Sequence, residues 1–182
     1  MIGAHFGNWE PLCPALTEKG FSTAMYVGAQ TNPLTDLLQN QTRRQWKIET
    51  IEKGSDATVR IWDALKQNRV VGMLVDQDER KKGVFVDFFG QAASSNTGAA
   101  AFHLMQQSPV LLFTSPYIRT RIEFRFERVH FQKIGNQEDD LTKLTQKMLA
   151  GLEKMIRRHP EQYFWMHKRW RTRPQDDSSS PY

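Results

Sequence analysis

The stretch AHFGNWEP, residues 4–11, has the pattern of a strand end, a tight turn and the start of a helix. His5 follows a short apolar segment, and Gly7 permits a tight turn after it. Asn8 can cap a helix whose first turn tolerates an acidic residue and a proline. Side chains five positions apart lie about 140° apart on one regular helix. His5 and Glu10 can therefore meet only if His5 stands in the turn before the helix.

A histidine and a glutamate in this arrangement form the base and its orienting partner, two parts of a catalytic triad. The helix N-terminus holds Glu10 ionised, and its carboxylate can accept a hydrogen bond from one imidazole nitrogen of His5. The other nitrogen is then a base. The chain has no G-x-S-x-G turn to present a serine nucleophile, so His5 would activate a hydroxyl group of the substrate. The H-x4-E spacing alone also occurs by chance.

Outside this stretch, short apolar runs alternate with helical patterns. We expect strands at 21–27, 70–76 and 110–115, and helices at 34–46, 57–67 and 98–107. This alternation is typical of βαβ units. The sequence therefore predicts an α/β fold, with a single mixed β-sheet and helices packed on its faces. In sheets of this kind a ligand lies beyond the strand ends.

Side-chain periodicity predicts which faces are buried. Residues 138–159 form the clearest helix, with an apolar stripe that ends near its basic last turn. In the helix at 57–67, Val59, Trp62 and Leu65 recur at core spacing. Residues 122–131 alternate as a half-exposed strand. The stripe of the long helix consists of Leu141, Leu144, Met148, Leu152 and Met155.

Composition indicates one ordinary domain. The chain has 182 residues, 39% of them hydrophobic, with no internal repeat and no dividing linker. We expect one domain over residues 1–174 and a disordered tail at 175–182. No apolar run reaches the roughly 18 residues of a spanning helix, and the first residues lack the charged-then-apolar order of a signal peptide. The single cysteine, Cys13, lies among apolar residues and predicts a buried thiol.

The net charge of +5 is concentrated near the C-terminus. Residues 157–174 hold six lysines and arginines and one acidic residue, Glu161. The net charge of this segment therefore equals the net charge of the whole chain. Such a segment fits an anionic partner, whether phosphate, acidic protein, nucleic acid or membrane surface. A solvated face is the alternative interpretation.

Four ordered blocks carry a resemblance to a known family. HFGNWE at 5–10 resembles the H-x4-[DE] block of the lysophospholipid acyltransferase superfamily, in the form found in lipid A late acyltransferases. VGMLVDQD at 71–78 is similar to that branch's strand with an acidic DQ end. Residues 83–113 resemble its V-x-F-F-G block, small-residue helix and proline-led strand. YFWMHKRWRTRP at 163–174 resembles its basic, tryptophan-rich close.

The resemblance implies an acyltransferase-like fold and a reaction. A fatty acyl group would move from acyl carrier protein, with coenzyme A as the alternative donor, to a hydroxyl of a lipid A precursor at the cytoplasmic face of the cell inner membrane. His5 would take the hydroxyl proton during attack on the thioester, and Glu10 would stabilise the imidazolium. The implied partners are acyl carrier protein, an anionic lipid acceptor and the membrane surface, without nucleic acid. No metal or cofactor is required.

Seven further residues are candidates for substrate binding. Two aspartates stand where related branches carry a second acidic motif, and a following arginine could meet phosphates. A glycine opens a helix whose N–H groups could face an anion. Three basic residues of the close could bind headgroups or the acidic carrier protein, and His167 is a weaker candidate beside them. The seven are Asp76, Asp78, Arg80, Gly98, Lys168, Arg169 and Arg171.

Only MIGA precedes His5, whereas family members usually carry an apolar anchor helix before this block. We therefore expect the anchor region to be missing, through a misplaced start or because the sequence is a fragment. Other acceptors remain open, including a lysophospholipid, a glycolipid and an aminolipid. A non-catalytic module that binds an anionic surface is a further alternative. A metal hydrolase is less well supported, because H-x4-E lacks the spacing of the H-E-x-x-H pair.

Overall fold

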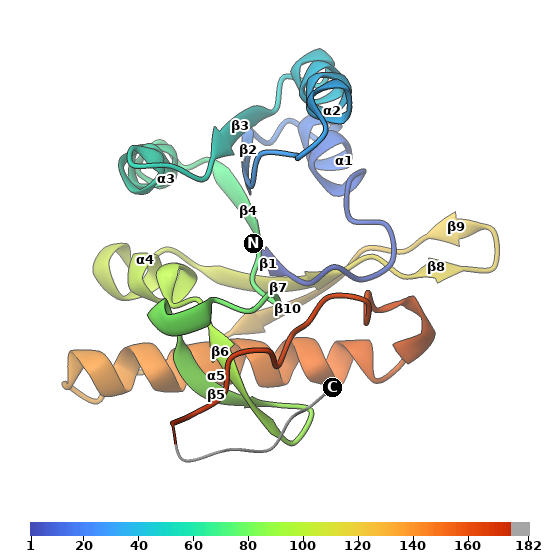
Figure 1. Cartoon of the computed structure of the whole chain (residues 1–182). Helices are drawn as coiled ribbons and strands as arrows, with labels where there is room; N and C mark the ends of the chain where they lie inside the picture. Colours follow the sequence, from blue (N-terminus) through green and yellow to red (C-terminus); the bar gives the residue numbers. More distant parts are fainter. Residues whose placement is uncertain (176–182) are drawn as a thin grey trace. The chain divides into compact units, whose positions relative to one another are not determined.

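The computed structural model describes residues 1–175. Its internal contacts divide the chain into two units. The first unit contains Met1 and Trp9–Met73, and the second contains Ile2–Asn8 and the chain from Leu74 onward. Figure 1 shows the helices and strands of both units.

The first unit is built from βαβ connections. Three parallel strands lie in the order β4, β2, β3, and a helix links each strand to the next along the chain. The strands are β2 (Thr23–Val27), β3 (Glu49–Glu52) and β4 (Val70–Leu74). The helices are α1 (Leu12–Glu18), α2 (Pro33–Gln45) and α3 (Ala57–Lys66). The strands and helices expected here are confirmed, and β3 is an addition to them.

Local sequence explains the ends and faces of these helices. Asn32 caps α2, since its side-chain oxygen accepts a hydrogen bond from the Leu34 amide at 2.9 Å, and a proline follows at the first helical position. The expected core face of α3 is wrong at Val59, whereas Trp62 and Leu65 are half-buried. Val59 is 61% exposed, whereas Ile61 and Ala64 are buried.

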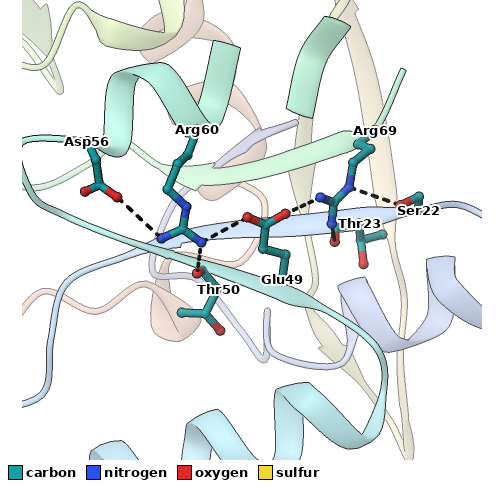
Figure 2. A network of polar contacts seen from close by, with 7 residues as sticks. All are labelled: Ser22, Thr23, Glu49, Thr50, Asp56, Arg60 and Arg69. Carbon is teal, nitrogen blue, oxygen red and sulfur yellow. Dashed lines mark hydrogen bonds and ion pairs between the residues drawn. The ribbon is translucent and has the colours of Figure 1, made fainter. Parts of the chain in front are cut away.

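A carboxylate at the start of β3 ties this unit together (Figure 2). Glu49 accepts a hydrogen bond from Arg60 of α3 at 2.9 Å and forms an ion pair with Arg69. Arg60 also donates to the Thr50 carbonyl, and Arg69 to the Thr23 carbonyl, each at 2.9 Å. Burial would raise the pKa of Glu49, but the two guanidinium groups hold it below its ordinary value.

The second unit is a mixed sheet with helices and two hairpins. Its strands lie in the order β10, β7, β1, with β1 parallel and β10 antiparallel to β7. The strands are β1 (Ile2–Gly3), β7 (Val110–Thr114) and β10 (Arg125–Val129). Two hairpins are added, β5 (Val84–Phe88) with β6 (Gln91–Ser95) and β8 (Tyr117–Ile118) with β9 (Arg121–Ile122). The helices are α4 (Gly98–Gln106) and α5 (Gln137–Ile156), and the 3₁₀ turns are η1 (Arg80–Lys82) and η2 (Pro160–Gln162).

Helix α5 organises the core of the second unit. It contacts β7 and β10 on one side and the β5–β6 hairpin on the other (Figure 1). Its inward side chains are fully or nearly fully buried, and each such Leu, Ile or Met contributes roughly 1.5–3 kcal/mol of burial free energy. They are Leu144, Met148, Leu149, Leu152, Met155 and Ile156. The expected stripe is thus confirmed for all its members except Leu141, which is half-buried.

The α/β class with mixed strand pairing is confirmed. The expected strand at 122–131 is shorter, because its first residues enter the β8–β9 hairpin and only Arg125–Val129 forms β10. None of the helices among residues 1–175 is long and apolar enough to cross a bilayer. The expected tail lies, apart from Gln175, outside the described residues, and the single domain over 1–174 stays a prediction.

Candidate active site

The turn that carries His5 is fixed by backbone hydrogen bonds. Gly7 has a φ of +60°, and a Cβ at this position would lie 2.1 Å from the carbonyl oxygen of Ser115. Its amide donates to the Gln162 carbonyl at 2.9 Å, and the Asn8 amide donates to the Ser115 carbonyl at 3.1 Å. Only glycine fits this conformation and this space, so Gly7 determines where the turn places His5.

The end of β4 brings a carboxylate to this turn. Past the end of β4, the Val75 amide donates to the Gly3 carbonyl at 3.0 Å, which sets the next residue, Asp76, beside His5. The Asp76 Oδ1 atom lies 2.8 Å from Nδ1 of His5, and Oδ2 accepts the backbone amide of His5 at 2.9 Å. The structure therefore brings together two of the residues that the sequence selected.

The charge of Asp76 fixes the chemistry of His5. Burial of Asp76 would raise its pKa, but hydrogen bonds and charge from His5, with the charge of His167, hold the pKa below its ordinary value. An ionised carboxylate only accepts hydrogen bonds, so Nδ1 of His5 donates to it. The basic nitrogen of His5 is then Nε2. The imidazole is 21% exposed, whereas Asp76 is fully buried.

A second imidazole lies against the same carboxylate. Nε2 of His167 is 3.7 Å from Oδ2 of Asp76 and 3.0 Å from the Tyr163 hydroxyl. The ring centroids of His167 and His5 are 6.3 Å apart. Burial lowers the pKa of His167, and the charges of His5 and Arg169 lower it further, whereas the charge of Asp76 raises it. The sequence indicated His167 only as a weaker candidate for anion binding than its basic neighbours, so this contact was not predicted.

Glu10 belongs to the first unit. Pro11 is the N-cap of α1, so Glu10 precedes the helix instead of lying in its first turn as the sequence suggested. Its Oε1 atom accepts a hydrogen bond from Nη2 of Arg43 at 2.9 Å. Arg43 is almost fully buried in α2, and the Glu10 side chain is 44% exposed. The pairing of Glu10 with His5 stays a prediction.

Three other candidates make contacts within the second unit. Asp78 accepts a hydrogen bond from the Thr172 hydroxyl at 2.8 Å. Arg80 begins η1, and its side chain is exposed. The Gly98 amide donates to the side-chain oxygen of Asn96 at 2.8 Å, so this N–H bonds within the chain. Substrate contacts by Asp78, Arg80 and Gly98 stay predictions.

In the basic segment at 163–174, some side chains face the interior and others face solvent. Lys168 and Arg171 are exposed, as an anion-binding surface requires. Arg169 is fully buried, and the substrate contact that the sequence indicated for it stays a prediction. Its Nη1 donates to the Ser94 carbonyl at 2.6 Å, and its guanidinium lies 5.4 Å from the Phe88 ring centroid. Arg169 thus anchors the close to the β5–β6 hairpin.

The cysteine behaves as expected, since Cys13 is buried in the first unit and burial raises its thiol pKa to about 11. Among residues 1–175, no group of three or more His, Cys, Asp or Glu side chains is arranged to hold a metal ion.

Comparison with known proteins identifies the family. The family model of bacterial lipid A biosynthesis acyltransferases matches residues 1–172. This chain belongs to that family. It is 29% identical over 140 residues to the lipid A biosynthesis palmitoleoyltransferase of Escherichia coli (strain K12), and equally so to a lipid A biosynthesis acyltransferase of Shigella flexneri. Each alignment covers 76% of this chain and 45% of the relative. The chain therefore spans less than half the length of these curated relatives.

The lipid A acyltransferase branch that the four sequence blocks indicated is thereby confirmed.

Proposed function

We propose that the protein carrying this chain transfers a fatty acyl group from an acyl thioester to a hydroxyl of a lipid A precursor, with acyl carrier protein as the donor's carrier. Family membership and the names of the two relatives support the reaction class. The contact between His5 and the buried Asp76 at 2.8 Å carries the proposal, because it supplies an oriented base.

The proposed transfer proceeds in balanced steps. Nε2 of His5 takes the proton of the acceptor hydroxyl as the oxygen attacks the thioester carbonyl carbon. The imidazolium of His5 is stabilised by the charge of Asp76 at Nδ1. The tetrahedral intermediate collapses with cleavage of the carbon–sulfur bond, and the thiolate takes the proton from Nε2. His5 returns to its starting state, and no acyl-enzyme forms.

The other candidate residues have supporting roles in this proposal. Glu10 is the second carboxylate of the motif and stabilises the charge that develops on His5. The exposed cations Arg80, Lys168 and Arg171 bind phosphates of the acceptor or the acidic carrier at the cytoplasmic face of the inner membrane. Arg169 supports the site from the interior.

A paired assay tests the proposal. Acyl-carrier-protein and coenzyme A thioesters are supplied in parallel, each with a lipid A precursor, a lysophospholipid, a glycolipid or an aminolipid as acceptor. We expect transfer to the lipid A precursor from the carrier-protein thioester. His5→Ala should lower the rate by about 10²–10⁴-fold, the range for loss of a general base. His130→Ala is the matched control, because His130 is exposed and lies outside the site. Full activity in His5→Ala would refute the mechanism, and preference for another acceptor would reassign the substrate.

A further inference from the structure

The basic segment at 163–174 is hydrogen-bonded directly to the turn that carries His5. The Phe164 amide donates to the His5 carbonyl at 2.9 Å, and Tyr163 forms a β-bridge with Phe6. Because Tyr163 is buried and His167 half-buried, both side chains face the interior, while Phe164 between them is exposed. The backbone therefore brings the His167 imidazole to the Asp76 carboxylate and the Tyr163 hydroxyl to His167.

Ring packing holds Tyr163 firmly enough to fix the position of the His167 side chain. Its ring packs against the rings of Phe88 and Phe89 at centroid distances of 6.2 and 6.3 Å, and against Trp165 at 4.7 Å. The hydroxyl then reaches Nε2 of His167 at 3.0 Å. The His167 ring lies edge-to-face with Tyr163 at a centroid distance of 5.6 Å and stacks with Phe164 at 6.0 Å. These ring contacts and the hydrogen bond restrict rotation of the His167 ring.

The charge of His167 matters for His5. Asp76 offers one negative charge, and two imidazoles lie against it. A proton on His167 would compete with His5 for that charge and would repel the proton that His5 takes up during transfer. The titratable and charged groups that face His167 are Asp76, His5, Tyr163 and Arg169.

We propose that His167, held by Tyr163, is a positioning residue. It keeps the Asp76 carboxylate paired with His5 and, while neutral, leaves His5 free to act as the base. This inference rests on the proposed function for its catalytic consequence. The coupling of the two imidazoles does not depend on the reaction and can be measured without substrate. The lowered pKa of His167 agrees with a neutral imidazole at physiological pH.

Two readouts test the inference. In an NMR titration of the imidazole C–H signals, His5 should show a coupled titration in the unaltered protein. In His167→Gln it should show a single step, because the second titrating imidazole is gone. Glutamine can still bond the Tyr163 hydroxyl. His159→Gln is the control, because the ion pair found for His159 is with Glu161. This change should leave the titration of His5 unaltered. An identical His5 titration with and without His167 would overturn the inference, even if acyl transfer fails altogether.

A second variant keeps the inference testable if His167→Gln does not fold. Tyr163→Phe retains the ring packing and removes only the hydroxyl. It should move the midpoint of His167, and the acid limb of the kcat/KM profile should move with it in the same direction. The loss of kcat should be at most about 10²-fold, as for a displaced catalytic group. A His167 midpoint that stays in place, or an acid limb that does not follow it, would overturn the inference.

Discussion

Two carboxylates in this molecule are each held between two basic side chains, and their partners differ. Glu49 lies between Arg60 and Arg69 (Figure 2), whereas Asp76 contacts His5 and lies near His167. Both carboxylates have a lowered pKa and are ionised at neutral pH. Guanidinium groups keep their proton throughout the accessible pH range, but imidazoles exchange theirs near neutrality. Only the Asp76 cluster can therefore transfer a proton.

The two carboxylates also differ in how far they are exposed to solvent. Glu49 is 31% exposed, and its arginines also bond the backbone of β2 and β3, so the cluster holds strands and a helix together. Asp76 is fully buried at the ends of strands, where its partner His5 stays partly open to solvent. A buried anion with one accessible titratable partner is the arrangement that general-base catalysis requires.

The strongest test of this comparison removes the charge from each carboxylate in turn. Asp76→Asn should lower the acyl-transfer rate by about 10²–10⁴-fold, because the amide no longer holds the tautomer or stabilises the imidazolium. Glu49→Gln should leave the rate per folded molecule unchanged and lower the denaturation midpoint. Steady-state kinetics and urea unfolding on both variants check the pair. Equal loss of activity in the two would show that the clusters do not differ in function.

Glu10 sharpens the comparison, because its partner in the structure is an arginine, as for Glu49. If Glu10 acts in catalysis as the motif predicts, Glu10→Gln should cause a large loss of kcat. The loss should be non-additive with His5→Ala, so that the double variant resembles the single one. A fall in thermal stability with an unchanged rate would instead place Glu10 with Glu49 as a structural carboxylate. Intact-protein mass spectrometry with donor alone should show no acyl adduct in any variant.

Much of the fold could be predicted from apolar patterns. Each expected helix is present, and the strands at 21–27, 70–76 and 110–115 correspond to β2, β4 and β7. Strand β3 was missed because ETIE is short and polar, and it lies beside β2 only after folding. Val59 was misplaced because a ten-residue helix offers more than one apolar face at helical spacing, and packing decides between them.

The site was predicted less completely, for a similar reason. His5 was selected by the H-x4-E motif, and Asp76 because related branches carry a second acidic motif at its position. Contacts of His167 and Arg169 depend on an irregular segment with no periodicity, so their direction could not be read from spacing. The sequence signal was the alternation of apolar and basic residues at 163–171, which only the β-bridge at Tyr163 resolves into two faces.

Acid stability should separate the two clusters further. A lowered histidine pKa means that the unfolded chain binds more protons below pH about 6.5, so His167 costs stability as the pH falls from there towards its folded pKa. The lowered pKa values of Asp76 and Glu49 add stability that is lost only as the pH falls below about 4. Urea midpoints at pH 7.5, 5.5, 4 and 2.5 should show two phases of loss. His167→Gln should remove the first phase and retain the second.

Surface cations give the smallest expected effect, and they test whether burial is what distinguishes the clusters. Lys168 and Arg171 are exposed, so converting both to glutamine should weaken binding to anionic lipid vesicles, each basic residue contributing roughly 1 kcal/mol near an anionic leaflet. The loss should shrink at high salt, because exposed charges are screened beyond about 8 Å at physiological ionic strength. Arg169→Gln is the matched inward-facing change, and it should lower stability at every salt concentration, since its contacts with Ser94 and Phe88 are shielded from ions. Vesicle co-sedimentation and thermal unfolding, each at low and high salt, separate the two outcomes. Unchanged binding of the double variant at low salt would show that the outward cations are only a solvated face, because removing a charge that attracts the leaflet must remove that attraction where the field is least screened.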